Sequence, residues 1–133
     1  MTWTLWDNTL VTGQAGLDGD HEEMARLFNL LRDTAEQRRD KESCSLVLAQ
    51  IIEHASTHFE LERQLMVQRR YPKIEQHDGE HIMLLAQAIE YKAAFDAGTV
   101  GPEIALTDFP DVWLSFHILF SDKDLARFLA ETG

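Results

Sequence analysis

Cysteine, proline and long hydrophobic runs are all scarce in this chain. Its 133 residues include three prolines and a single cysteine, Cys44. A lone cysteine excludes an intramolecular disulfide, and we expect Cys44 to be a half-buried structural residue in a reducing compartment. No apolar run approaches the roughly 18 residues of a membrane-spanning helix. The amino terminus also lacks the basic and apolar regions of a secretory signal, so the sequence predicts a cytoplasmic protein.

Positive charge is also in short supply. Lysine and arginine together number 12, against 23 aspartates and glutamates, which leaves a formal net charge of −11. Nucleic acids and anionic membrane surfaces require a basic face, so this balance argues against both as partners. No motif identifies a protein partner.

No segment shows the alternating pattern of a β-strand, whereas four segments are amphipathic with a helical period. The sequence therefore predicts an all-α, antiparallel, up-down-up-down four-helix bundle in one domain, 1–133. We expect an extended N-terminal arm followed by four helices, over residues 1–16, 17–39, 43–70, 73–97 and 109–130. Pro72 is expected to close the second helix, and Gly98 the third.

Histidine is the residue that stands out among those present. Five of the six histidines form an ordered series with two carboxylates: His21, His58, Glu62, His77, His81, His117 and Asp122. Two pairs, His58 with Glu62 and His77 with His81, are four residues apart and therefore share a helix face. Because each group lies in a different amphipathic segment, the four helices can direct these side chains to one interior point.

This pattern has a chemical interpretation. A polar group that faces an apolar bundle interior must be paired or must bind something. One such histidine is usually a hydrogen-bonded core residue, but five on the inner stripes of four helices indicate a metal site. Imidazoles with carboxylates suit iron, zinc, copper or nickel. Seven donors are too many for one tetrahedral zinc, whereas two six-coordinate ions bridged by both carboxylates use the set well.

The carboxylate of the last helix is ambiguous by spacing alone. Asp122 follows His117 by five residues, which places it about 140° round an ideal helix. Asp124 follows by seven residues and lies closer to the face of His117, but two turns away. Helical periodicity leaves both aspartates open.

Four motifs follow one another along the chain: Leu17-Asp18-x-x-His21, His58-Phe59-Glu60-Leu61-Glu62, His77-x-x-x-His81 and Trp113-Leu114-Ser115-Phe116-His117-Ile118-x-x-x-Asp122. This ordered set resembles hemerythrin of the bacterial type. The resemblance covers nearly the whole chain and implies two iron ions, Fe²⁺ or Fe³⁺, with an oxo or hydroxo bridge. One iron would take His77, His81 and His117. The other would take His21 and His58 and keep an open position for dioxygen.

The resemblance also assigns the carboxylates and the pocket. It implies that Glu62 and Asp122 bridge the two irons, which selects Asp122 over the other aspartate of the last helix. Trp113, Leu114 and Ile118 match residues that line the dioxygen pocket, where an apolar wall slows the entry of water.

The implied function is reversible dioxygen binding for transport, storage or delivery, without enzymatic turnover. Two alternatives use the same centre: an oxygen- or redox-sensing module, and a di-iron enzyme acting on peroxide or nitric oxide. Ferritin-like di-iron proteins carry Glu-x-x-His motifs. This chain contains none, which argues against that class.

Two features are left without a role. His54 lies one turn before His58, where the family often carries an aromatic residue. A hydrogen-bond donor to a metal ligand, an extra ligand and a proton relay are the functional options, and a core or partly exposed histidine is the favoured interpretation. The tetrapeptides Asp18-Gly-Asp-His21 and Asp78-Gly-Glu-His81 echo each other. Four residues are too few to indicate duplication, and we interpret the echo as coincidence.

Overall fold

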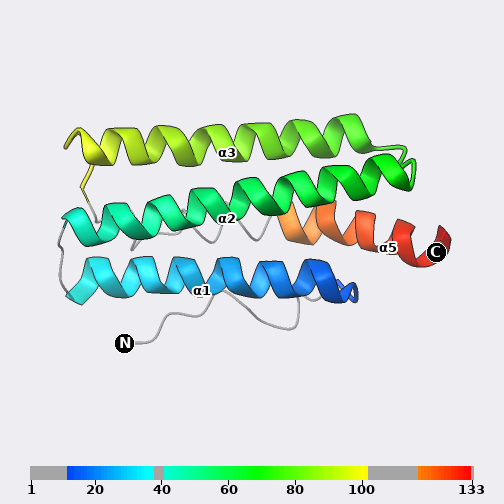
Figure 1. Ribbon diagram of the computed structural model, residues 1–133, viewed down its shortest axis with the longest axis horizontal. Helices are drawn as coiled ribbons and strands as arrows, with labels where there is room; N and C mark the ends of the chain where they lie inside the picture. Colours follow the sequence, from blue (N-terminus) through cyan, green and yellow to red (C-terminus); the bar gives the residue numbers. More distant parts are fainter. Residues whose placement is uncertain (1–11, 38–40, 102–116, 133) are drawn as a thin grey trace.

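The computed structural model describes residues 12–37, 41–101 and 117–132. Its elements are α1 (Ala15–Gln37), α2 (Lys41–Gln68), α3 (Ile74–Asp96), the π-helix η3 (His117–Asp122) and α5 (Lys123–Thr132). Successive helices run in alternating directions, and α5 continues directly from η3 to form the last antiparallel member (Figure 1). The chain is therefore an antiparallel four-helix bundle, as the sequence predicts.

The boundaries of α2 and α3 lie one or two residues from those expected, and the first and last helices also differ from the prediction. α1 begins at Ala15, so the last two residues assigned to the arm are helical, while residues 1–11 lie outside the described part. The fourth helix was expected to be continuous over 109–130. Instead, it changes from π to α geometry after Asp122 and extends to Thr132, and residues 109–116 are not described.

α2 ends before the proline that was expected to close it. Arg70 adopts a left-handed backbone conformation with φ 53. This turn lets the backbone N–H of Tyr71 donate to the carbonyl of Met66 at 3.0 Å, and that of Arg70 to Val67 at 3.2 Å. These bonds form a Schellman motif, which satisfies the last carbonyls of the helix. The backbone turn at Arg70, rather than Pro72, therefore terminates α2.

α3 ends in the same way, and here the sequence prediction is confirmed. Gly98 has φ 81, a conformation that glycine adopts without steric cost. Its N–H donates to the Phe95 carbonyl at 3.1 Å, and the N–H of Thr99 donates to Ala94 at 2.9 Å. Gly98 is thus the left-handed residue of a second Schellman motif.

Two apolar clusters lie at different levels of the bundle. The larger one joins α1, α2 and α3 and includes Met24, Phe28, Leu31, Cys44, Ile51, Ala55 and Phe95. Cys44 is 1% exposed, so it is fully buried rather than half-buried. The smaller cluster closes the end near α5 and contains Leu17, Met66, Tyr71, Leu125, Ala126 and Leu129. Along α1, α2 and α3, the histidines of the predicted site fall between the two clusters.

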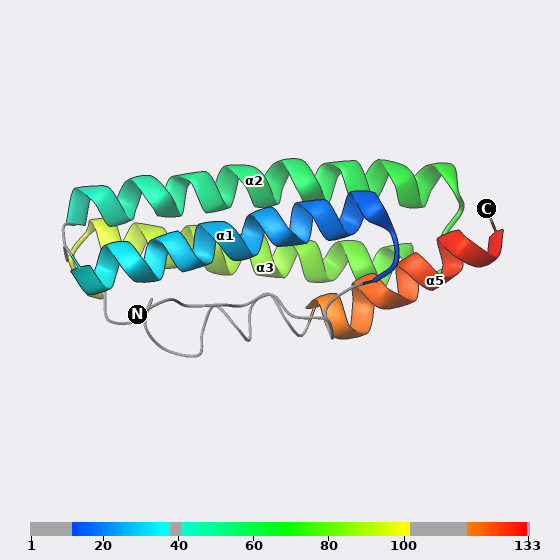
Figure 2. The ribbon, with the colours of Figure 1, turned by 90° about the horizontal axis from the view of Figure 1, so that it is seen from below.

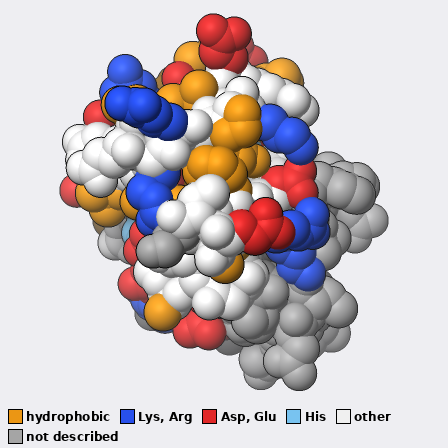
Figure 3. Space-filling view, turned by 90° about the vertical axis from the view of Figure 1, so that its right-hand side faces the viewer, with side chains coloured by type: hydrophobic (Ala, Val, Ile, Leu, Met, Phe, Trp, Pro, Cys, Tyr) orange, Lys and Arg blue, Asp and Glu red, His pale blue; other side chains and the backbone are white. Residues whose placement is uncertain are grey.

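The surface at the end of the bundle closed by the smaller cluster carries both hydrophobic and charged side chains. Figure 3 faces this end and shows hydrophobic side chains bordered by Lys, Arg, Asp and Glu side chains. Seen from below, α5 extends outward past the end of α1 (Figure 2). None of the described helices is long and apolar enough to cross a membrane.

Candidate metal centre

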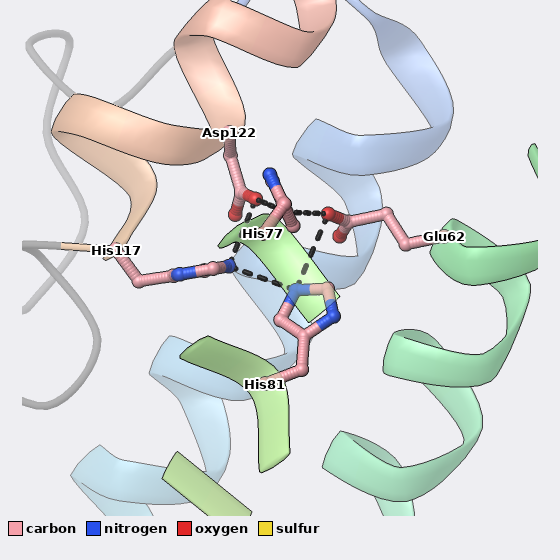
Figure 4. Close-up of side chains that lie close together, drawn as sticks. All are labelled: Glu62, His77, His81, His117 and Asp122. Atoms are coloured by element: carbon pink, nitrogen blue, oxygen red, sulfur yellow. Dashed lines mark hydrogen bonds and ion pairs between the residues drawn. The ribbon is translucent and has the colours of Figure 1, made fainter. Parts of the chain in front are cut away.

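Five buried side chains from three elements converge in the bundle interior (Figure 4). They are Glu62 of α2, His77 and His81 of α3, and His117 and Asp122 of η3. One donor atom of each lies within 4.8 Å of the donor atoms of the other four. The i, i+4 spacing of His77 and His81 places both rings on the inner face of α3.

The distances among these five donors suit a six-coordinate ion. Neighbouring corners of an octahedron with bonds of about 2.1 Å lie about 3.0 Å apart. The Nε2 atom of His77 is 2.6 Å from Glu62 Oε1 and 3.0 Å from Asp122 Oδ1. The Nε2 atoms of His81 and His117 are 2.9 Å apart, and His117 Nε2 is 3.0 Å from Asp122 Oδ1. His81 Nε2 lies 3.4 Å from Glu62 Oε1.

A second group of donors adjoins the first and shares both carboxylates with it. The Nε2 atom of His21 is 2.8 Å from Asp122 Oδ2, and that of His58 is 2.6 Å from Glu62 Oε2. The two rings meet edge to face, with centroids 5.1 Å apart. Each carboxylate therefore presents one oxygen to each group. Such an arrangement would allow both carboxylates to bridge a pair of ions.

The π-helix explains how Asp122 reaches the site. In a π-helix the hydrogen bond runs from residue i to i+5, so residues five apart lie about one turn apart. η3 spans His117 to Asp122, and this interval brings the two side chains together. Asp124 lies in α5, where its carboxylate binds Lys73 Nζ at 3.2 Å and is 37% exposed. Tertiary geometry thus places Asp122, and not Asp124, in the cluster.

The donor atoms fit a metal pair better than they fit one another. Within the described part of the chain, neither oxygen of Asp122 has a well-aligned hydrogen bond, although imidazole nitrogens lie close by. The Nε2 of His58 and the Oε2 of Glu62 are 2.6 Å apart but are also misaligned. Buried polar atoms that crowd together without pointing at each other are costly unless something binds between them.

The two carboxylates remain ionised despite their burial. Burial and the charge of Asp122 raise the pKa of Glu62, but the imidazoles of His58 and His77 outweigh them and lower this pKa to about 2. Burial likewise raises the pKa of Asp122, yet the charge and contact of His117 hold it well below its usual range. Both side chains are therefore anionic donors at neutral pH.

The pKa values of three histidines in the donor groups shift in two directions. Burial lowers the pKa of His58 and of His77, but the adjacent carboxylates outweigh it and raise both values to about 9. For His81, burial dominates and lowers the pKa. Without a metal, protons on His58 and His77 balance the buried negative charge. A cation held by the two donor groups would take over that balance and displace these protons.

Two further carboxylates orient histidines of the two donor groups across helix boundaries. Asp20 of α1 accepts a hydrogen bond from His58 Nδ1 at 2.8 Å. Glu80 of α3 accepts one from His117 Nδ1 at 3.2 Å and another from Ser121 Oγ at 2.5 Å. Such bonds fix which ring nitrogen is protonated and leave Nε2 free to bind a metal.

The sequence did not single out Asp20 or Glu80, although a signal was present. Each acid directly precedes a predicted ligand, His21 or His81, in the two echoing tetrapeptides. A residue directly before a histidine does not share that histidine's face of the helix. It can therefore reach a histidine on a neighbouring element. Asp20 and Glu80 thus occupy the same place in the two tetrapeptides, and each contacts the Nδ1 of a histidine on another element.

All seven predicted ligands lie in the two donor groups. His54 stands outside both groups, and its Nε2 lies 3.0 Å from the backbone carbonyl of Asp20. Trp113 and Leu114 of the predicted dioxygen pocket lie outside the described residues. Ile118 belongs to η3, but its side chain is not described.

The arrangement matches a known family of metal-binding bundles. The family profile of the Hemerythrin HHE cation binding domain matches residues 12–129. The chain belongs to the hemerythrin family. Hemerythrins bind dioxygen at a non-haem di-iron centre, and the two donor groups sharing two carboxylates suit such a pair of ions.

Individual hemerythrins are similar over nearly the full chain. A bacteriohemerythrin of Pseudomonas paraeruginosa is 29% identical over 123 residues, which cover 92% of this chain and 78% of that protein. One from Stenotrophomonas maltophilia is 25% identical, covering 95% and 81%. A crystal structure of wild-type hemerythrin has a TM-score of 0.79 at 27% identity, with 98% of each chain covered. A hemerythrin variant gives a TM-score of 0.86 at 24% identity, covering 98% and 99%, and shares the fold.

Proposed function

We propose that this hemerythrin-family chain folds as one domain and binds dioxygen reversibly at a di-iron centre, as a carrier, store or delivery protein in the cytoplasm. The observation that carries the proposal is the inequality of the two donor groups. One offers three imidazoles and two carboxylate oxygens, and the other offers two imidazoles and the two remaining oxygens. This inequality supports one saturated iron and one iron with room for a small ligand.

The ligand count supports the same division. If the two ions were six-coordinate and shared one solvent-derived oxygen, the group of His77, His81 and His117 would supply the rest of a complete set for one ion. The group of His21 and His58 would leave the other ion one ligand short. When bound, the iron pair supplies the electrons that dioxygen binding draws on. The protein supplies buried imidazoles and only two anionic ligands, a set that favours reversible binding over strongly oxidised iron.

The surroundings of the site support binding without turnover. Two carboxylates outside the donor groups, Asp20 and Glu80, accept hydrogen bonds from the Nδ1 atoms of His58 and His117. They are therefore committed to orientation rather than to proton transfer. We propose that Trp113, Leu114 and Ile118 form the apolar wall that limits access of water to bound dioxygen.

Metal analysis and oxygen cycling test this function. The purified protein is expected to contain two irons per chain. After anaerobic reduction, admitting dioxygen should produce an iron-to-oxygen charge-transfer colour, and removing the gas should abolish it over repeated cycles. The measurement is the visible spectrum at each step, with iron quantified before and after.

Three outcomes would contradict the proposal, each in a different way. A single zinc without oxygen-dependent absorption would overturn the di-iron assignment. Rapid bleaching to an oxidised resting state, with no recovery on removing the gas, would favour an enzyme or a sensor. Steady consumption of peroxide or nitric oxide would favour an enzyme.

A further inference from the structure

His54 is the one histidine that the two donor groups leave out. It lies on α2 one turn before His58 and is partly buried. Its ring is parallel to that of His58, with an interplanar angle of 4° and centroids 6.4 Å apart. Its Nε2–H donates to the backbone carbonyl of Asp20 at 3.0 Å. His54 therefore contacts α1 at the residue directly before His21.

Asp20 is bound twice by α2, through its main chain and its side chain. The carbonyl accepts the hydrogen bond from His54, and the carboxylate accepts that of His58 Nδ1 at 2.8 Å. One residue of α1 thus joins two histidines that lie a turn apart on α2. The two bonds link α1 and α2 at the level of His21 and His58, the two imidazoles of the second donor group.

The side chain of Asp20 needs such support because packing does not hold it. It is 38% exposed, whereas the His58 side chain is 5% exposed. Water can compete for an exposed carboxylate, so its bond to His58 depends on how firmly the backbone of Asp20 is placed. A hydrogen bond from a partly buried imidazole to that backbone supplies the placement.

We propose that His54 is a positioning residue for the two-histidine iron. Its Nε2–H donates to the carbonyl of Asp20 and so holds the backbone of that residue in place. Asp20 then orients His58 through its carboxylate, and its backbone keeps the adjacent His21 level with His58 along the bundle. The inference rests on the proposed di-iron function, because it assigns the residue to one of two irons. It requires the Nε2–H donor and not merely a ring at this position.

Two substitutions separate the donor from the ring. His54→Phe keeps an aromatic ring and removes the donor, whereas His54→Gln removes the ring and retains an N–H at a similar reach. The readout is the rate at which a ferrous chelator removes the first equivalent of iron from the anaerobic, reduced holoprotein. That equivalent should come from the group with fewer protein ligands.

The expected effects differ in size between these two variants. His54→Phe should lose the first iron about three to ten times faster than wild type, less than the 10- to 100-fold typical of losing a direct partner. His54→Gln should stay within about twofold of wild type, because it restores the bond to the carbonyl. Neither should change the rate for the second equivalent by a comparable factor.

Ser121 offers a matched control on the other group. Its hydroxyl donates to Glu80, which accepts the hydrogen bond of His117 Nδ1, so Ser121 is also one step removed from a ligand. Ser121→Ala should therefore accelerate release of the second iron equivalent more than the first. Opposite selectivity in the two variants is the signature of local positioning, whereas general destabilisation accelerates both steps.

Several results would overturn the inference. These are an unchanged first-iron rate in His54→Phe, equal rates in the Phe and Gln variants, and parallel acceleration of both equivalents with a lowered melting temperature. Iron release is measured without dioxygen, so the two proposals can fail separately. A chain that loads two irons but does not bind dioxygen reversibly would overturn the proposed function and leave this test in force.

Discussion

At the level of single residues, two aspartates only two positions apart have opposite environments. Asp122 is fully buried among imidazoles, and Asp124 is 37% exposed beside Lys73 and Arg127. The first is surrounded by groups that stabilise a buried anion or share a cation with it. The second forms surface ion pairs, which typically contribute less than about 1 kcal/mol.

This difference predicts unequal effects of the same substitution at the two sites. Asp122→Asn retains the shape but removes the anionic bridge, so iron content should fall below about half of the wild-type value, as expected for loss of a ligand. Asp124→Asn should retain nearly all the iron. Iron per chain after identical purification is the measurement. Strong iron loss in Asp124→Asn would show that the wrong aspartate has been assigned.

At the level of elements, the last helix depends on the rest of the bundle. α5 has 10 residues, and isolated helices shorter than about 12 residues are marginal in water. It is held by its buried face, with Leu125, Ala126 and Leu129, and by Arg69 of the turn after α2. Arg69 Nη2 donates to the Leu129 carbonyl at 3.1 Å and to Thr132 Oγ1 at 3.0 Å. These bonds satisfy the C-terminal end of a helix that lacks a basic residue in its own last turn.

Removing this anchor should loosen α5 locally. Arg69→Ala is expected to destabilise the helix by about 1–2 kcal/mol, because hydrogen bonds from a charged donor are lost. Amide hydrogen exchange in 123–132 should accelerate by about tenfold, since 1.4 kcal/mol corresponds to a factor of ten.

An exposed arginine on the same helix is the control for that substitution. Arg127 is 69% exposed and pairs with Asp124 at 3.5 Å. Arg127→Ala should change exchange in α5 by less than about twofold, because such pairs contribute little. Equal acceleration in both variants would mean that general charge, and not the bonds of Arg69, holds the helix.

At the scale of the whole molecule, removing iron should make stability depend on pH in a defined way. The pKa values of His58 and His77 in the iron-free fold are about 9, above the ordinary 6.5. Their contribution to the free energy of unfolding is therefore complete below about pH 6.5 and is lost as the pH rises through about 9. The pKa of Glu62 is lowered from 4.5 to about 2, so its contribution is complete above about pH 4.5 and is lost toward pH 2.

The expected result is a maximum in the free energy of unfolding of the iron-free protein between about pH 4.5 and 6.5. Urea denaturation at pH 6 and pH 9, with and without iron, is the measurement. The iron-loaded protein should not lose stability over this interval, because iron replaces the protons and binds more tightly as pH rises. Equal urea midpoints for the iron-free protein at pH 6 and 9 would contradict the assignment of protonated His58 and His77.

The sequence by itself determined the number of helices and the pool of donor side chains. Amphipathic periodicity is local, so the stripe holding His77 and His81 or His58 and Glu62 could be predicted without knowing its neighbours. The Gly98 terminus follows from the same local logic. The Schellman turn at Arg70 could not be predicted in this way, because arginine rarely adopts the left-handed backbone conformation.

Only the tertiary structure decided which atoms face each other. The π turn that carries Asp122 into the site departs from the α-helical period, so spacing could not distinguish it from Asp124. The contacts of Asp20, Glu80 and His54 each join elements that are distant in sequence, and no periodicity encodes them. A helix face is a property of the local chain. The partner of a side chain on that face depends on how the helices pack.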